Sequence, residues 1–250
     1  PPEAFHAYIG ALSKPVHAAV NDKYYKIIAE ALRVCGQFVK VIVMLKSSPE
    51  YNQLVVSLFN TVHARLDTQD IDQDVKESAI TTMGLIITYL GNSLQSQLKP
   101  CLVLLLDRLR NEVTRITTTK TFAMIAQSEL DIDLKPVLAD LANELASFLR
   151  KNNRMLRQSS LYALDAILHK YGKNVDAKLI DSVVEEATEL ISDADLQLSN
   201  LALVLCSTII SEFPKAAQTM QKVVLPKMLT LLQSSALQGV GLDSLLLLLG

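Results

Sequence analysis

The stretch NNRMLRQSSLYAL, residues 152–164, carries a side-chain pattern that returns along the chain. Asn153 precedes Arg157 by four positions, and the small residue Ser160 follows that base by three. The same arrangement occurs in NEVTRITTTKTFA (111–123) and in DQDVKESAITTM (72–83). Self-similarity at a regular distance is the signature of a repeat protein.

The basic residue of each stretch sets a register that can be counted. The basic residue, or the residue aligned with it, is taken as the reference position of each repeat. These positions are Lys26, Lys76, Arg115, Arg157, Ser199 and Gly241, and they are separated by 50, 39, 42, 42 and 42 residues. Four positions earlier stand Asp22, Asp72, Asn111, Asn153 and Asp195, with Leu237 as the exception. Small residues follow the register by three positions, at Ala29, Ala79, Thr118, Ser160, Ala202 and Ser244. Isoleucines follow it by ten, at Ile86, Ile125, Ile167 and Ile209, with Gly36 as the exception. A period near 42 residues is in the range of HEAT and armadillo arrays, in which each repeat is built from helices.

Each position of the pattern has a physical reason. An Asp or Asn at a helix start accepts hydrogen bonds from free amides of the first turn, worth about 1 kcal/mol. The base one turn later can pair with that cap or with the cap of the adjacent repeat, adding about 0.3–1 kcal/mol when exposed. The small residue lets the two helices of a pair approach closely, and the isoleucine faces the interior. Because no single helix pair can bury its apolar stripe alone, we expect the repeats to stack.

Apolar residues follow helical spacing almost throughout the chain, and no stretch shows the alternation of a strand. Short polar breaks divide the sequence into about eleven helices, which pair into hairpins. The sequence therefore predicts an all-α fold, a curved α-solenoid of about five and a half HEAT repeats in one continuous array. The expected repeats are 3–46, 50–91, 95–128, 133–172, 176–213 and a truncated 215–250. We expect the array to be an internal part of a longer solenoid.

The composition narrows the classes of function. A net charge of −2 over 250 residues argues against a dedicated nucleic-acid binder. Cys35, Cys101 and Cys206 lie far apart in apolar stretches, which is typical of buried thiols in a reducing compartment. The longest apolar runs are about half as long as a membrane span, and no signal peptide opens the sequence. We therefore expect a soluble intracellular protein.

Motifs for catalysis, cofactors or metals are weak or absent in the sequence. The stretch DIDQD (70–74) resembles the start of a calcium-binding loop, but Val75 and Thr81 stand where that loop needs Gly and Glu. The glycines of QGVGLDS (238–244) lack the strand and the third glycine of a dinucleotide site. We predict no catalytic residue, no cofactor and no metal.

One basic cluster is a candidate partner contact. Arg150, Lys151 and Arg154 surround a single predicted turn without an acidic residue among them. A solvated turn is the simpler interpretation, and contact with an acidic patch on a partner is the functional one.

Several long strings resemble the middle of the cullin-associated, neddylation-dissociated family, also called TIP120. They are DIDQDVKESAITTMGLIITYLGNSL (70–94), LDRLRNEVTRITTTKTFAMIA (106–126), DLKPVLADLANELASFLRKNNRMLRQSSLYALDAIL (133–168) and LISDADLQLSNLAL (190–203). The resemblance runs from about residue 22 to residue 250 and includes loop residues, so it is more specific than the repeat pattern.

The resemblance implies a non-catalytic regulator of cullin–RING ubiquitin ligases. Such proteins wrap unmodified scaffolds of a cullin and a RING-box subunit, block attachment of the ubiquitin-like modifier, and promote exchange of adaptor and substrate-receptor modules. It further implies a cytoplasmic and nuclear protein. We expect no nucleic-acid partner, no membrane partner and no obligate homo-oligomer. The alternatives are another HEAT scaffold, of the transport-receptor or phosphatase-scaffold type, or a compact all-helical enzyme.

Overall fold

The computed structural model describes residues 1–250 except 70–71, 235–242, 244–245 and 247–250. The described residues form eleven α-helices joined by turns and short 3-10 segments, and they contain no strand. The first six are α1 (Ile9–Ala19), α2 (Tyr25–Met44), α3 (Tyr51–Asp67), α4 (Gln73–Leu90), α5 (Leu98–Arg110) and α6 (Arg115–Ala126). The others are α7 (Leu138–Phe148), α8 (Arg154–Tyr171), α9 (Ala177–Thr188), α10 (Leu196–Glu212) and α11 (Ala217–Leu232). The predicted all-α fold is confirmed.

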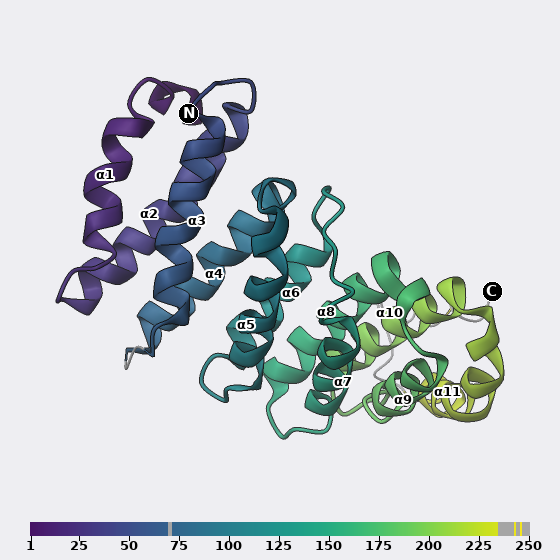
Figure 1. Ribbon diagram of the computed structural model, residues 1–250. Coiled ribbons are helices and arrows are strands. Elements are labelled where there is room, and N and C mark those ends of the chain that lie inside the picture. Colours follow the sequence, from purple (N-terminus) through teal and green to yellow (C-terminus); the bar gives the residue numbers. More distant parts are fainter. Residues whose placement is uncertain (70–71, 235–242, 244–245, 247–250) are drawn as a thin grey trace. The chain divides into compact units, whose positions relative to one another are not determined.

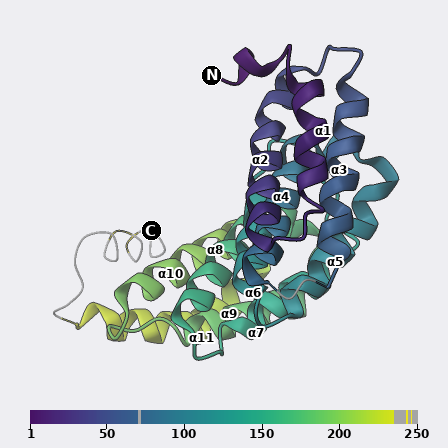
Figure 2. The same cartoon turned by 90° about the vertical axis from the view of Figure 1, so that its left-hand side faces the viewer.

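The chain divides into two compact units, Pro1–Pro136 and Val137–Gly250. In the first unit α2 packs on α4 and α4 packs on α6, so the second helices of successive pairs form one layer, with α1, α3 and α5 in the other (Figure 1). Figure 2 shows α1, α2 and α3 of this unit side by side. In the second unit α8 packs on α10, while α9 contacts both α7 and α11. Both units therefore have the layered helix pairs of an α-solenoid.

The predicted repeats can be compared with the helix pairs. Each of the first five contains one pair, from α1 and α2 up to α9 and α10. The sixth contains α11, and most of its remainder lies outside the described residues, as do Leu237, Gly241 and Ser244 of the counted register. A single continuous array stays a prediction.

The small and apolar positions of the repeat pattern are buried, as predicted. The small residues are at most 1% exposed at Ala29, Ala79, Thr118, Ser160 and Ala202. The isoleucines Ile86, Ile125, Ile167 and Ile209 are fully buried. Position 36 holds glycine where the other repeats have isoleucine. A Cβ there would already lie 3.1 Å from Leu85 Cδ1 of α4, so little room is left for a larger side chain.

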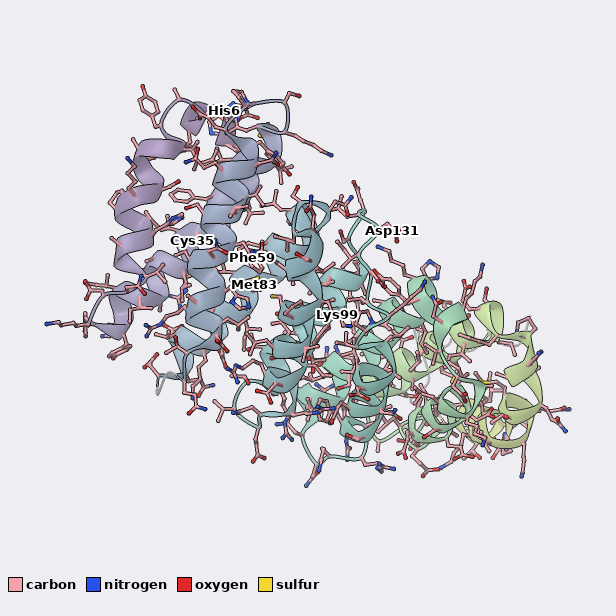
Figure 3. All side chains as sticks on the ribbon, viewed as in Figure 1. His6, Cys35, Phe59, Met83, Lys99 and Asp131 are labelled. Carbon is pink, nitrogen blue, oxygen red and sulfur yellow. The ribbon has the colours of Figure 1, made fainter. Side chains whose placement is uncertain are left out.

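Helices α4 and α6 approach each other closely at Gly84, in the middle of α4. A Cβ at this position would lie 2.5 Å from Thr121 Cγ2 and 2.8 Å from Met124 Cε, both in α6. Cys35 of α2 and Met83 of α4, labelled in Figure 3, are also fully buried. The absence of a side chain at Gly84 thus sets the spacing of α4 and α6.

Hydrogen bonds about one repeat apart tie neighbouring pairs together. Ser128 Oγ donates to the carbonyl of Thr88 over 2.5 Å, 40 positions earlier in the chain. In the second unit Thr208 Oγ1 donates to Asp165 Oδ1 over 2.5 Å, 43 positions earlier. These bonds recur near the 42-residue period because equivalent points of adjacent pairs face each other.

No single helix of the described residues is long and apolar enough to cross a membrane. One pair passes a length and composition test together, Leu196–Glu212 with Pro214–Leu232, but the chain bends by 118° between them.

Candidate partner-binding surface

Three of the predicted Asp and Asn positions cap the helices that follow them. The side chains of Asp72, Asn153 and Asp195 accept the backbone amide three residues on, over 3.1, 3.0 and 3.1 Å. Helices α4, α8 and α10 begin at the next residue in each case. These bonds satisfy amides that have no partner within the helix.

The other two positions, Asp22 and Asn111, lie before the helix start rather than at the cap. Asp22 Oδ1 accepts the amide of Tyr24 over 2.8 Å, and Asn111 Oδ1 accepts that of Val113 over 2.9 Å. Bonds to an amide two residues on close a turn of the Asx type. The chain makes this turn first, and α2 and α6 begin only at Tyr25 and Arg115.

The two arginines among the predicted bases donate to backbone carbonyls. Arg115 Nη2 donates to the carbonyl of Arg110 over 3.2 Å, and Arg157 Nε donates to the carbonyl of Lys151 over 2.6 Å. Arg110 is the last residue of α5, and carbonyls at the end of a helix lack partners within it, so Arg115 satisfies one of them; Lys151 lies in the turn between α7 and α8. Lys26 instead lies over the Tyr25 ring, 6.0 Å from its centroid.

Asp195, which caps the second helix of the next pair, is bound by Arg154, three positions before Arg157. Arg154 Nε lies 2.6 Å from Asp195 Oδ2, and Arg154 Nη2 lies 3.1 Å from Asp195 Oδ1. This bidentate hydrogen bond with Arg154 holds the pKa of the Asp195 carboxyl below its usual range and raises the pKa of Arg154. The pair with the cap of the adjacent repeat, one of the two pairings predicted for the base, is therefore made by Arg154 rather than Arg157.

The predicted partner-contact cluster is thus largely paired within the chain. Besides the Arg154–Asp195 pair, Arg150 Nη1 lies 2.5 Å from Glu186 Oε1. Lys151 is exposed, and its carbonyl accepts the bond from Arg157. The acids that neutralise the cluster come from the next helix pair, so the sequence around the turn did not reveal them. A role for Arg150, Lys151 and Arg154 in binding a partner stays a prediction.

A polar hollow on the second-helix layer of the first unit is a stronger candidate surface. It has a volume of about 590 Å³ and is lined by residues of α2, α4 and α6. Gly36, Ser78, Thr82 and Thr121 are buried at its floor. The rest of its lining is exposed or half-buried and consists of the polar Arg33, Gln37, Asp74, Glu77, Thr81, Thr117 and Lys120 and the apolar Leu85 and Met124.

The charges in this hollow are of both signs and are partly paired. Arg33 binds Asp74 of α4 and Glu30 of its own helix. Glu77 Oε1 accepts a bond from Gln73 over 2.8 Å, whereas Lys120 is exposed and has no ion-pair partner among the described residues. The hollow therefore presents hydrogen-bonding groups at helical spacing without a dominant charge. The hollow was not predicted from the sequence. Its sequence signal is the polar residues that recur every three or four positions on successive second helices.

No set of three or more His, Cys, Asp or Glu side chains in the described ranges is placed to hold a metal ion. The acids of the calcium-like stretch have structural roles, since Asp72 caps α4 and Asp74 pairs with Arg33, while Asp70 lies outside the described residues. The cysteines are buried and free, and burial raises the pKa of each thiol to about 12, at Cys35, Cys101 and Cys206.

The stacked helix pairs and the polar face that they build define a helical-repeat protein of the armadillo and HEAT type. A designed armadillo repeat protein of known structure superposes with a TM-score of 0.68, over 94% of this chain and 97% of that chain. Its sequence is 18% identical, so this likeness shows the fold alone.

Sequence comparison shows which known proteins the chain is similar to. A family model described as CAND1-like, TPR repeats matches residues 1–83. The cullin-associated NEDD8-dissociated protein 1 of Dictyostelium discoideum is 43% identical over 98% of this chain and 20% of its own length. Its namesake from Arabidopsis thaliana is 43% identical over 96% of this chain, again 20% of that protein. The chain is therefore similar over nearly its whole length to a segment of cullin-associated NEDD8-dissociated proteins, which confirms the predicted resemblance, and it spans about a fifth of the length of these relatives.

Proposed function

We propose that this chain is a segment of a non-catalytic regulator of cullin–RING ubiquitin ligases. In this proposal the whole protein wraps the unmodified scaffold of cullin and RING-box subunit, blocks attachment of the ubiquitin-like modifier and promotes exchange of substrate-receptor modules. It works in the cytoplasm and nucleus, without nucleic acid, membrane or obligate self-association.

The observation that carries this proposal is the 43% identity to proteins named for cullin association, over 98% of the chain. The fold supports it, because stacked helix pairs offer a long surface that contacts an extended partner at many points. A non-catalytic role is also supported by the state of the thiols, which burial keeps protonated and out of reach of a substrate.

Within this segment we assign the partner contact to the polar hollow on α2, α4 and α6. Its Arg33, Glu77 and Lys120 come from three successive second helices, so a single extended partner segment reaches all of them. Charges at such an exposed surface fix orientation and association rate more than they add affinity. Several of them must therefore change together to give a clear effect.

The test is the affinity of the whole protein for a purified, unmodified cullin–RING scaffold. We expect the double variant Glu77→Lys with Lys120→Glu to bind at least about tenfold more weakly, because both changes place wrong charges against the partner. The matched control is Glu50→Lys with Lys99→Glu, which swaps two exposed charges outside the hollow; Lys99 lies on α5 (Figure 3).

Three outcomes separate the parts of the proposal. Weaker binding by the hollow variant alone supports both the function and the contact. Equal binding by both variants rejects the hollow as the contact but leaves the function standing. If the unaltered protein does not bind the scaffold, the function itself is wrong.

A further inference from the structure

A second cavity in the first unit lies where helices meet their connecting turns. It has a volume of about 490 Å³ and is lined by the ends of α3 and α5, the first turns of α4 and the turn before α6. This volume is within the range of about 300–1,000 Å³ that is usual for small-molecule sites. The cavity is distinct from the polar hollow, with which it shares no lining residue.

The charged residues in the described part of this cavity's lining are all basic. They are Arg65, Lys76 and Arg108, and none of its lining residues within the described part of the chain is acidic. They come from three different helices, α3, α4 and α5. Like charges gathered around a partly enclosed space repel one another, and a bound anion relieves that repulsion.

The guanidinium of Arg108 is held in place before any ligand arrives. Its Nη2 donates to the carbonyl of Leu66 over 3.1 Å, and its Nη1 lies 2.9 Å from Asp107 Oδ2. Asp107 is 67% exposed and so is largely screened by solvent, whereas the Arg108 side chain is only 19% exposed. This arrangement leaves a positive group fixed at the cavity wall.

Lys76 differs from its counterparts in the repeat. Arg115 and Arg157 stand at the same register position; Arg115 donates to the carbonyl of Arg110, the last residue of α5, and Arg157 donates to the carbonyl of Lys151 in the turn after α7. Lys76 is half-buried, and among the described residues its ammonium has no hydrogen-bond or ion-pair partner. Asp72, one turn earlier, uses its carboxylate to cap the amide of Val75. A half-buried charge is normally paired, because removing it from water is costly.

Uncharged donors complete the lining. Asn111 accepts the amide of Val113 through Oδ1, which leaves its side-chain NH₂ as a donor. Gln69 is exposed at the cavity rim and offers a second amide. Cationic groups and amide donors around a small space match the chemistry of phosphate oxygens.

We propose that this cavity binds a small molecule that carries several phosphate groups. Three bases on separate helices suit an anion with more than one charged group, and the cavity is large enough for such a molecule. Because α3, α4 and α5 belong to two successive helix pairs, the ligand also bridges those pairs and stabilises their stacking.

The test is calorimetric titration of the 250-residue chain with inositol hexakisphosphate as the probe. Inorganic phosphate and unphosphorylated inositol are titrated in parallel. We expect the hexakisphosphate to bind at least about tenfold more tightly than inorganic phosphate, and inositol not to bind, because each charge-assisted bond contributes severalfold to affinity. Binding should also raise the melting temperature of the chain.

Variants separate a built site from general attraction to positive charge. Lys76→Gln should weaken binding of the probe about tenfold, Lys76→Arg should preserve it, and Lys40→Gln, an exposed lysine of α2, should leave it unchanged. Equal weakening by Lys76→Gln and Lys40→Gln overturns the proposal, as does the absence of binding to the probe. Equal affinity for inorganic phosphate and the probe overturns the inference that several phosphates are recognised.

Discussion

Replacing Gly84 with alanine tests the packing of the second-helix layer. The new methyl group would lie 2.5 Å from Thr121 Cγ2, whereas carbon atoms pack favourably at about 3.5–4.0 Å. Helices α4 and α6 must therefore separate by about 1 Å or distort. Overpacking of this kind costs about 1–3 kcal/mol, while alanine gains up to about 1 kcal/mol over glycine in a helix.

The matched control is Gly10→Ala in α1, where nothing lies within 4 Å of the added Cβ. Both variants gain helix propensity, and the gain is smaller at Gly10 because it lies in the first turn of α1, so the difference between them is a lower bound on the steric cost. We expect the free energy of unfolding of Gly84→Ala to lie below that of Gly10→Ala by about 1–3 kcal/mol. Urea unfolding followed by circular dichroism gives the difference, and hydrogen exchange shows whether α4 and α6 open first.

A double variant identifies the atom responsible. Thr121→Ser deletes Cγ2 and keeps the hydroxyl, so it should recover most of the stability lost in Gly84→Ala, a coupling between neighbours. Met124 Cε, the other close atom, is the end of a flexible side chain and can move aside. If Gly84→Ala is as stable as Gly10→Ala, or if Thr121→Ser restores nothing, the proposed close approach is wrong.

Three further predictions concern caps, ion pairs and thiols. Asn153→Ala should lower the free energy of unfolding by about 1 kcal/mol through loss of the α8 cap, while Asn152→Ala beside it should have little effect, as urea unfolding will show. The pKa of Asp195 is lowered by Arg154, so the pair stabilises the folded state above the unfolded-state pKa of about 4 and loses this effect as pH falls through the lower folded-state pKa. The free energy of unfolding of the Arg154→Gln variant should therefore be lower than that of the unaltered chain at neutral pH and equal to it in acid. A difference that does not change with pH would contradict the pairing. Finally, a thiol reagent should label no cysteine of the folded chain and all three after unfolding; rapid labelling of the folded chain would contradict their burial.

The repeat and its core could be predicted from the sequence because they depend on short-range patterns. Asn153, Ser160 and Ile167 lie within fifteen positions of one another, and their roles as cap, close-packed small residue and core isoleucine follow from helix geometry. The same reasoning placed Asp22 and Asn111 at helix caps, where the structure shows a turn that precedes the helix. A local pattern does not distinguish these two uses of the same side chain.

The candidate surfaces could not be predicted because they depend on how successive pairs stack. Arg150 and Arg154 are neutralised by Glu186 and Asp195, which follow 36 and 41 positions later. The cavity with Lys76 similarly combines residues of two pairs. Relationships of this kind require the offset between neighbouring helices, which no single repeat contains.

The most direct test of the proposed function compares two forms of the partner. The whole protein should be titrated in parallel against a purified cullin–RING scaffold without the modifier and against the same scaffold carrying NEDD8. We expect tight binding to the unmodified scaffold that is lost on modification. Equal binding to both forms, or binding to neither, would contradict the assignment of this segment to a cullin regulator.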